Sequence, residues 1–303
     1  MPESTVKISP FDTLFSSGEK AVEVSRTFDH KPYKLGGHID RLYRGLAMLD
    51  IDPGIDQDQM ADLTRQTLDA NMGTLPRNVD WQMLHYVSAG PAALFEIVPP
   101  DELKPTVMIQ CFPLVNRIGK MANKYTEGTD LVVVEQTAMD QDIVPPQIKS
   151  SGRMDHLIAR RQAKKKTPGA TGVLLDRNGR VTEGTGASLF VVQNGVIQTA
   201  PESRVLTGIT REMVFDIADA SGIPIEEADL SVEDVETADE VFIISTIINQ
   251  VHARTFEGRT IGNGKVGAIT DQIRKAYAEE VGVDFVQQAQ DYAHTINNQD
   301  PNV

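Results

Sequence analysis

Runs of β-prone residues alternate with runs at helical spacing along the whole chain, and this alternation predicts an α+β protein. The expected strands lie at 22–28, 31–34, 81–88, 106–112, 131–135, 171–175, 181–183, 187–192, 196–199 and 240–245. The expected helices lie at 38–49, 60–72, 154–165, 208–220 and 268–281. In the third of these helices, Leu157, Ile158 and Arg161 are expected on the buried side.

The length of 303 residues exceeds one average domain, which favours a division into two domains. The segment 116–128 is poor in apolar residues and contains glycines and lysines, so we expect a linker or mobile loop there. This predicts a small α+β domain at 1–115, an interdomain linker or loop at 116–128, and a large α+β domain at 129–303.

Charge and cysteine content exclude several classes of function. The 29 basic and 43 acidic residues give a net charge of −14, which argues against nucleic acid or an anionic membrane as a partner. The one cysteine, Cys111, cannot form an internal disulfide or a thiolate metal site, and we expect no metal. No apolar stretch approaches the roughly 20 residues of a membrane span, and the first residues lack the pattern of a signal peptide. We therefore expect a cytoplasmic protein.

Two segments have features of an anion-binding site. The residues 206–211 read Leu-Thr-Gly-Ile-Thr-Arg and begin a predicted helix, whose N-terminal amides and dipole can bind phosphate. An ordinary threonine cap would explain the same residues. Ser245 and Thr246 end a predicted buried strand, where a ligand can bind or where the strand simply turns.

Two further residues could carry out chemistry. Lys149 follows a segment stiffened by two prolines and precedes small residues; a buried lysine with a lowered pKa can attack a carbonyl and form a Schiff base. Most lysines are instead solvated. Glu183 lies between two β-prone runs, and the glycines at 184 and 186 allow the backbone to approach a flat group. The alternative is a glutamate at the edge of a hairpin.

The order of these features resembles that of the class IV aminotransferases. A lysine is followed about 30 residues later by Glu-Gly-x-Gly, then by Leu-x-Gly-Ile-Thr-Arg, and then by Ser-Thr after a strand. The resemblance extends from Lys7 to Gly282 and includes His-Ile-Asp-Arg-Leu at 38–42, with a less close match at 18–23. It implies a two-domain enzyme of fold type IV whose large domain, 129–303, binds the cofactor pyridoxal 5'-phosphate. It also implies a homodimer in which each active site borrows a loop from the partner.

The resemblance also implies roles for individual residues. Lys149 would hold the cofactor as an internal aldimine and shuttle the substrate proton, and Glu183 would pair with the pyridine nitrogen. Leu206 would pack on the face of the ring away from Lys149. The remaining cofactor contacts, chiefly to the phosphate, would come from Arg41, Gly208, Ile209, Thr210, Ser245 and Thr246. His38 is either a further contact or a histidine that merely begins a helix.

The chain departs from the family pattern where the substrate would bind. Arg153 stands where many members have a tyrosine, about four positions after the lysine, and Ser188 stands where an asparagine is common. The segment 85–91 has no arginine to clamp a substrate carboxylate, as D-amino-acid transaminases do. The walls of the substrate pocket are expected to be Val22, His85, Tyr86 and Ile247.

Four functions compete on this sequence. An aminotransferase would move an amino group between an amino acid or primary amine and a 2-oxo acid by a ping-pong mechanism. A lyase of the aminodeoxychorismate type would eliminate pyruvate instead. A catalytically silent scaffold is disfavoured because Lys149, Glu183 and the 208–210 segment occur together. A nucleotide-binding oxidoreductase is disfavoured because no Gly-x-Gly-x-x-Gly turn joins a strand to a helix.

Overall fold

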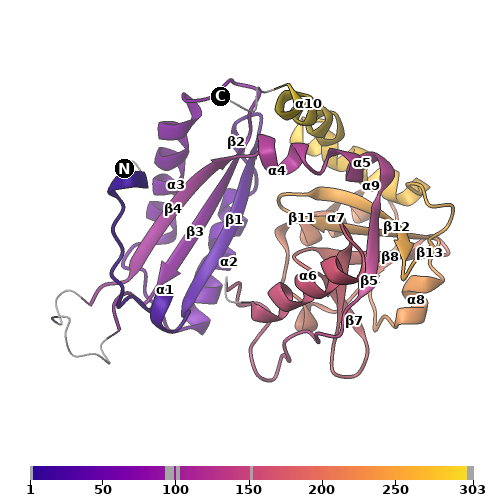
Figure 1. The fold of residues 1–303 in the computed structure, drawn as a ribbon, viewed down its shortest axis with the longest axis horizontal. Coiled ribbons are helices and arrows are strands. Elements are labelled where there is room, and N and C mark those ends of the chain that lie inside the picture. The colour runs from indigo at the N-terminus through magenta and orange to yellow at the C-terminus, as the bar shows by residue number, and fades with distance from the viewer. Residues whose placement is uncertain (1–2, 93–98, 100–102, 151–152, 299–303) are drawn as a thin grey trace.

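The computed structural model describes residues 3–92, 99, 103–150 and 153–298, and it contains two β-sheets with helices packed against them. Figure 1 shows the first sheet beside the second, with the N-terminal third of the chain forming the first. This arrangement confirms the α+β prediction. None of the described helices combines the length and the apolar character that crossing a membrane requires.

The first sheet has four antiparallel strands in the order β2-β1-β3-β4. The strands are β1 Lys20–Phe28, β2 Lys31–Pro32, β3 Trp81–Ser88 and β4 Thr106–Pro113. Two helices, α2 Leu35–Met48 and α3 Gln57–Met72, pack against one face of this sheet. Leu42 and Leu46 of α2 are buried there against Ala21 and Val87, because apolar residues recur on one side of the helix. The short elements η1 Glu3–Thr5 and α1 Thr13–Ser16 precede the sheet.

The second sheet has nine strands in the described part of the chain, with β13 paired to β12 beside the path β10-β9-β8-β11-β12-β5-β6-β7. The strands are β5 Thr129–Val133, β6 Thr171–Leu175, β7 Val181–Gly184, β8 Ser188–Gln193, β9 Val196–Thr199, β10 Ile225–Glu227, β11 Glu240–Ser245, β12 Asn249–Phe256 and β13 Arg259–Thr260. The central strands are buried nearly throughout, so their positions are set by continuous apolar runs.

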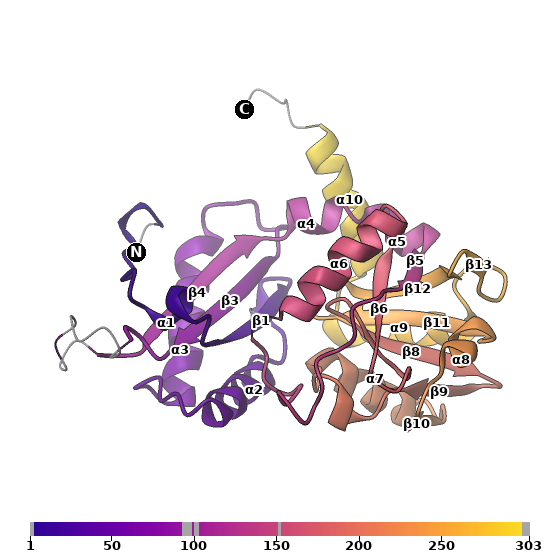
Figure 2. The same cartoon turned by 60° about the horizontal axis from the view of Figure 1, so that its bottom comes forward.

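Helices lie over the second sheet in both views (Figures 1 and 2). The helical elements from residue 154 onward are α6 Met154–Lys166, η4 Glu202–Arg204, α7 Ile209–Ala220, α8 Val232–Glu236, α9 Ala268–Val281 and α10 Phe285–Asn297. Met213 and Val214 of α7 and Ile273 and Tyr277 of α9 enter the main apolar core. This core fixes the ends of β7, β8 and β11, and residues at these ends line a cavity.

The orientation of α6 differs from the prediction. Leu157, Ile158 and Arg161 are exposed, whereas Ala159 and Ala163 are fully buried against β5 and β6. The contact is close: a Cβ atom added at Gly172 of β6 would lie 3.1 Å from the Cβ of Ala163. Only small side chains fit this contact, so the larger apolar residues of α6 face outward.

The segment 116–128 is helical rather than a loop. It consists of most of α4 Val115–Gly119 followed by α5 Ala122–Glu127, and both helices pack against α10 near the top of Figure 1. Ile118, Ala122 and Tyr125 are buried, so apolar residues spaced by three and four positions stabilise these short helices. We propose that the boundary between the two domains lies within α4 and α5.

Candidate active site

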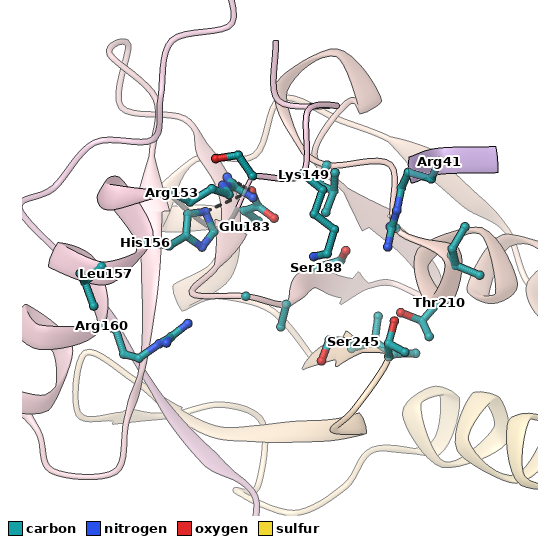
Figure 3. A pocket seen from close by; sticks show the side chains of 18 residues that line it. Arg41, Lys149, Arg153, His156, Leu157, Arg160, Glu183, Ser188, Thr210 and Ser245 are labelled. Carbon is teal, nitrogen blue, oxygen red and sulfur yellow. Dashed lines mark hydrogen bonds and ion pairs between the residues drawn. The ribbon is translucent and has the colours of Figure 1, made fainter. Parts of the chain in front are cut away.

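A cavity of about 310 Å³ lies between the N-terminal helix α2 and the ends of the strands in the second sheet. All of the residues expected to hold the cofactor line it, namely Arg41, Lys149, Glu183, Leu206, Gly208, Ile209, Thr210, Ser245 and Thr246. Figure 3 shows Lys149 between Glu183 on one side and Arg41 on the other, with Thr210 and Ser245 on the Arg41 side. The structure therefore brings residues that are up to 205 positions apart into one site.

The Lys149 side chain is half-buried, and its amino group lies in this cavity, deep within the protein. Burial, followed by the positive charge of Arg41, lowers the pKa of Lys149 to about 8. The backbone carbonyl of Lys149 accepts a hydrogen bond of 2.8 Å from the Val22 amide of β1. The lysine is thus attached to the first sheet although it follows the second sheet's β5 in sequence.

The lowered pKa gives a testable pH dependence. Only the neutral amine attacks an aldehyde, so reaction of Lys149 with pyridoxal is expected to accelerate about tenfold per pH unit at low pH and to level off near pH 8. Stopped-flow absorbance with the cofactor-free protein measures this rate. A rate that continued to rise through pH 10 would contradict the burial of this amine. The Lys149→Ala variant gives the background from other lysines.

The N-terminus of α7 forms an anion-binding corner of the cavity. Gly208 is the N-cap residue and offers no side chain to the first amides, so those of Ile209 and Thr210 lack a side-chain cap. A Cβ atom at Gly208 would lie 3.2 Å from the Cβ of Arg211 and 3.3 Å from the Oγ of Ser188, so the backbone here packs tightly against β8. Together with the helix dipole, this corner can bind phosphate.

Arg41 of α2 contributes a positive charge to the same side of the cavity. Its Nε donates to Oε2 of Glu23 at 2.9 Å and its Nη2 donates to Oε1 at 2.6 Å, a bidentate pair that fixes the guanidinium. Its Nη1 donates to the Thr207 carbonyl at 2.8 Å, directly before α7. Burial raises the pKa of Glu23, but Arg41 and His38 outweigh burial and hold that pKa below its ordinary value.

His38 lies behind Arg41 rather than among the residues that line the cavity. Its Nδ1 donates to Oε1 of Glu23 at 2.9 Å, and burial lowers its pKa. His38 therefore supports the Glu23–Arg41 pair from α2 and is more than a histidine that begins a helix.

Glu183 of β7 lies on the other side of Lys149 and also forms an ion pair. Its Oε1 accepts a hydrogen bond of 2.7 Å from Nη2 of Arg153 and lies 3.4 Å from Nε2 of His156. Burial raises the pKa of Glu183, but Arg153 and His156 outweigh burial and lower it to about 2. Glu183 is therefore a buried anion throughout the physiological pH range.

The four expected pocket walls do not line the cavity. His85 points to the opposite side of its sheet, where its Nε2 lies 2.8 Å from the Thr64 hydroxyl of α3 and burial lowers its pKa to about 4. Tyr86 is paired with Val22 across the sheet, so strand alternation places both on the face away from α2 and α3. Ile247 is buried in the main core.

The sequence interpretation did not assign several residues of the cavity. His156, Leu157 and Arg160 reach it from one side of α6, at spacings of one and three residues. Arg160 points toward the interior in Figure 3. Arg153, His156 and Arg160 recur at helical spacing, which indicates a polar face at the start of α6. The apolar residues at 157 and 158 stand between them and obscure this pattern. Arg153 was noted only as a departure from the family pattern.

Comparison with known proteins identifies similar chains. A model of the family described as amino-transferase class IV matches residues 20–254. A Methanocaldococcus jannaschii protein provisionally named a branched-chain-amino-acid aminotransferase is 31% identical over 282 residues, which cover 91% of this chain and 92% of that protein. D-alanine aminotransferase of Listeria monocytogenes is 29% identical over 284 residues, with 92% of each chain covered.

Solved structures resemble this one over nearly their whole length. The branched-chain amino acid aminotransferase of Escherichia coli superposes with a TM-score of 0.83 at 25% identity, covering 92% of this chain and 91% of that chain. The branched-chain aminotransferase of the thermophilic archaeon Thermoproteus uzoniensis, solved with norvaline, superposes with a TM-score of 0.80 at 24% identity, covering 96% and 94%. The two-sheet architecture is therefore that of fold type IV.

Proposed function

The chain belongs to the class IV aminotransferases, and from this membership we propose that it transfers an amino group between an amino acid or primary amine and a 2-oxo acid by a ping-pong mechanism, with pyridoxal 5'-phosphate bound at Lys149. One observation carries the proposal: a buried amine with a lowered pKa lies between an anion-binding corner and a buried carboxylate in one cavity. A silent scaffold would have no reason to keep such a costly buried charge.

The residues of the anion-binding corner fit the phosphate of this cofactor. The Ile209 and Thr210 amides can donate to it, and Arg41 can add a charge-assisted contact because Glu23 already orients its guanidinium. Ser245 and Thr246 offer hydroxyls at the end of β11. Leu206 and Gly208 line the cavity nearby, where Leu206 would contact a face of the ring.

The other end of the cavity fits the pyridine nitrogen. Glu183 is an anion and can accept a hydrogen bond from a protonated ring nitrogen. The cofactor, when bound, supplies an electron-accepting ring that stabilises a carbanion at the substrate Cα. Lys149 attaches the cofactor through Nζ and then takes up and returns the substrate proton at the same atom, a role that suits an amine with a pKa of about 8.

Part of the substrate pocket is proposed on the sheet face that carries Val22 and Tyr86. The Val22 amide bonds the Lys149 carbonyl, so this face begins directly beside the lysine. Ile247 would form a more distant wall, whereas His85 faces α3 and lies outside the pocket. The donor stays undefined between branched-chain amino acids, D-amino acids and (R)-amines, since relatives of the first two kinds match similarly well.

We also propose a homodimer in the cytoplasm. Large apolar side chains are exposed throughout the segment that contains Lys149, at Met139, Ile143, Val144, Met154, Leu157 and Ile158. Such a concentration is typical of a surface that binds another protein, and a second copy would cover it beside the cavity. The single cysteine, Cys111, suits a reducing compartment.

A reduction and substrate panel tests the function. The protein incubated with pyridoxal phosphate is expected to turn yellow, and borohydride should bleach it irreversibly with the label on Lys149. The loaded protein is then mixed with D-alanine, L-leucine or (R)-1-phenylethylamine, each with 2-oxoglutarate or pyruvate. Transfer to the oxo acid supports the proposal. A protein that stays colourless contradicts it, and release of pyruvate from aminodeoxychorismate without an acceptor identifies a lyase instead.

A further inference from the structure

Arg153 forms an ion pair with Glu183 in the wall of the cavity. It is the N-cap residue of α6, yet its side chain makes no cap and turns into the cavity. Its Nη2 lies 2.7 Å from Oε1 of Glu183 and 3.8 Å from Oδ2 of Asp155. Figure 3 shows its guanidinium directed at Glu183, with His156 beside it.

The two carboxylate oxygens of Glu183 have different contacts. Oε1 accepts from Arg153 and faces His156, whereas Oε2 has no hydrogen-bond partner among the residues that the structure describes. A carboxylate can accept at both oxygens. The arrangement therefore holds the group by one oxygen and leaves the other for a donor in the cavity.

The pair also changes the charge near that donor. The guanidinium of Arg153 is permanently charged, so the pair places a positive charge beside the carboxylate at every physiological pH. A buried carboxylate that is already paired attracts a further proton less strongly than a lone one.

We propose that Arg153 is a positioning residue for amino-group transfer. Its guanidinium holds Oε1 of Glu183, presents Oε2 to the pyridine nitrogen, and partly offsets the negative charge of the carboxylate. This inference rests on the proposed role of Glu183. Asp155, His156 and Lys149 are the other titratable groups near the pair, and His156 acts from the same helix as Arg153.

Substitution of Arg153 by methionine tests the inference through an absorbance titration. Removing the positive charge leaves Glu183 uncompensated, so the pH at which the lysine-bound chromophore of the loaded enzyme loses its proton is expected to rise by roughly one unit or more. The turnover number kcat should fall on the order of 10²-fold, with little change in KM for the oxo acid, because the ring partner is misplaced. Arg153→Lys should restore part of the titration because it keeps the charge.

Arg161→Met is the matched control. Arg161 is exposed on the same helix and is not among the cavity residues, so its loss removes the same charge without touching Glu183. Its titration and kcat are expected to match the parent. Thermal melting of each cofactor-free variant separates these effects from a loss of folding.

A double substitution provides the sharper test. If Arg153 acts through Glu183, then Arg153→Met should shift the titration little further once Glu183→Gln is present. An equal shift in both backgrounds overturns the inference, as does an Arg153→Met variant that behaves like Arg161→Met. Failure of borohydride to label Lys149 in the parent would instead refute the proposed function, so the two failures are distinguishable.

Discussion

Replacing Lys149 by alanine is expected to reduce amino-group transfer by roughly 10³-fold or more, because the variant loses both the covalent attachment and the proton carrier. The Nζ atom is buried in the cavity with a pKa of about 8, and no other lysine lines that cavity in the described part of the chain. Steady-state rates with the best donor and acceptor of the panel measure the loss.

Two further variants define what that loss means. Lys149→Arg keeps a positive charge but cannot attack an aldehyde at neutral pH, so it should be as inactive as the alanine variant. Lys275→Ala removes an exposed lysine from α9 and should keep the parent rate. Transfer at the parent rate by Lys149→Ala would refute the assignment of this lysine and the mechanism proposed for the site.

Replacing Glu23 by glutamine is expected to lower the free energy of unfolding by about 3–5 kcal/mol, because it leaves the buried guanidinium of Arg41 without its counter-ion. The same change should weaken binding of the cofactor phosphate, since Arg41 loses its bidentate anchor. Denaturant unfolding of the cofactor-free protein and fluorescence titration with pyridoxal phosphate measure the two effects separately.

The acid limb of stability gives a second readout for Glu23. The pKa of Glu23 in the folded protein lies below its ordinary value, so its stabilising effect is complete above the ordinary pKa and is lost as the pH falls. The glutamine variant does not titrate, and its deficit relative to the parent should shrink in acid. Asp40→Asn, an exposed change on the same helix, is the control. A deficit equal to that of the control would mean that the pair contributes nothing.

The sequence predicted which residues gather around the cavity better than it predicted what surrounds those residues. Lys149, Glu183 and the 206–211 segment carry local signals, a stiffened approach, paired glycines and a helix start, and these are properties of short stretches of chain. Their convergence on one cavity depends on the order of strands in the sheet, which the family resemblance supplied.

The predictions for the pocket walls were wrong where a shift of one residue along a strand, or the packing of a neighbouring element, decides which way a side chain points. His85 and Tyr86 are adjacent on β3, and because side chains alternate along a strand only one of them can face away from α3. Arg41 pairs with Glu23 of a strand, and Glu183 pairs with Arg153 at the start of a helix whose orientation the sequence does not reveal. Neither ion pair could therefore be derived from the spacing of residues along the chain. Phe285, Ala289 and Tyr292 recur at helical spacing in α10, a signal that was present but not used.

The hydrogen bond from Val22 to the Lys149 carbonyl restricts how ligands can be exchanged. Together with the Arg41 contact to the Thr207 carbonyl, it joins the N-terminal part of the chain to both sides of the cavity, so separation of the two sheets would displace the Lys149 backbone and the N-terminus of α7. Substrates are therefore expected to enter past Arg160 of α6, which is exposed at the edge of the cavity and lies outside the apolar surface proposed for the homodimer. Entry and release then require only side-chain motion at this edge of the cavity, and the backbones that carry Lys149 and Arg41 keep their positions during each exchange.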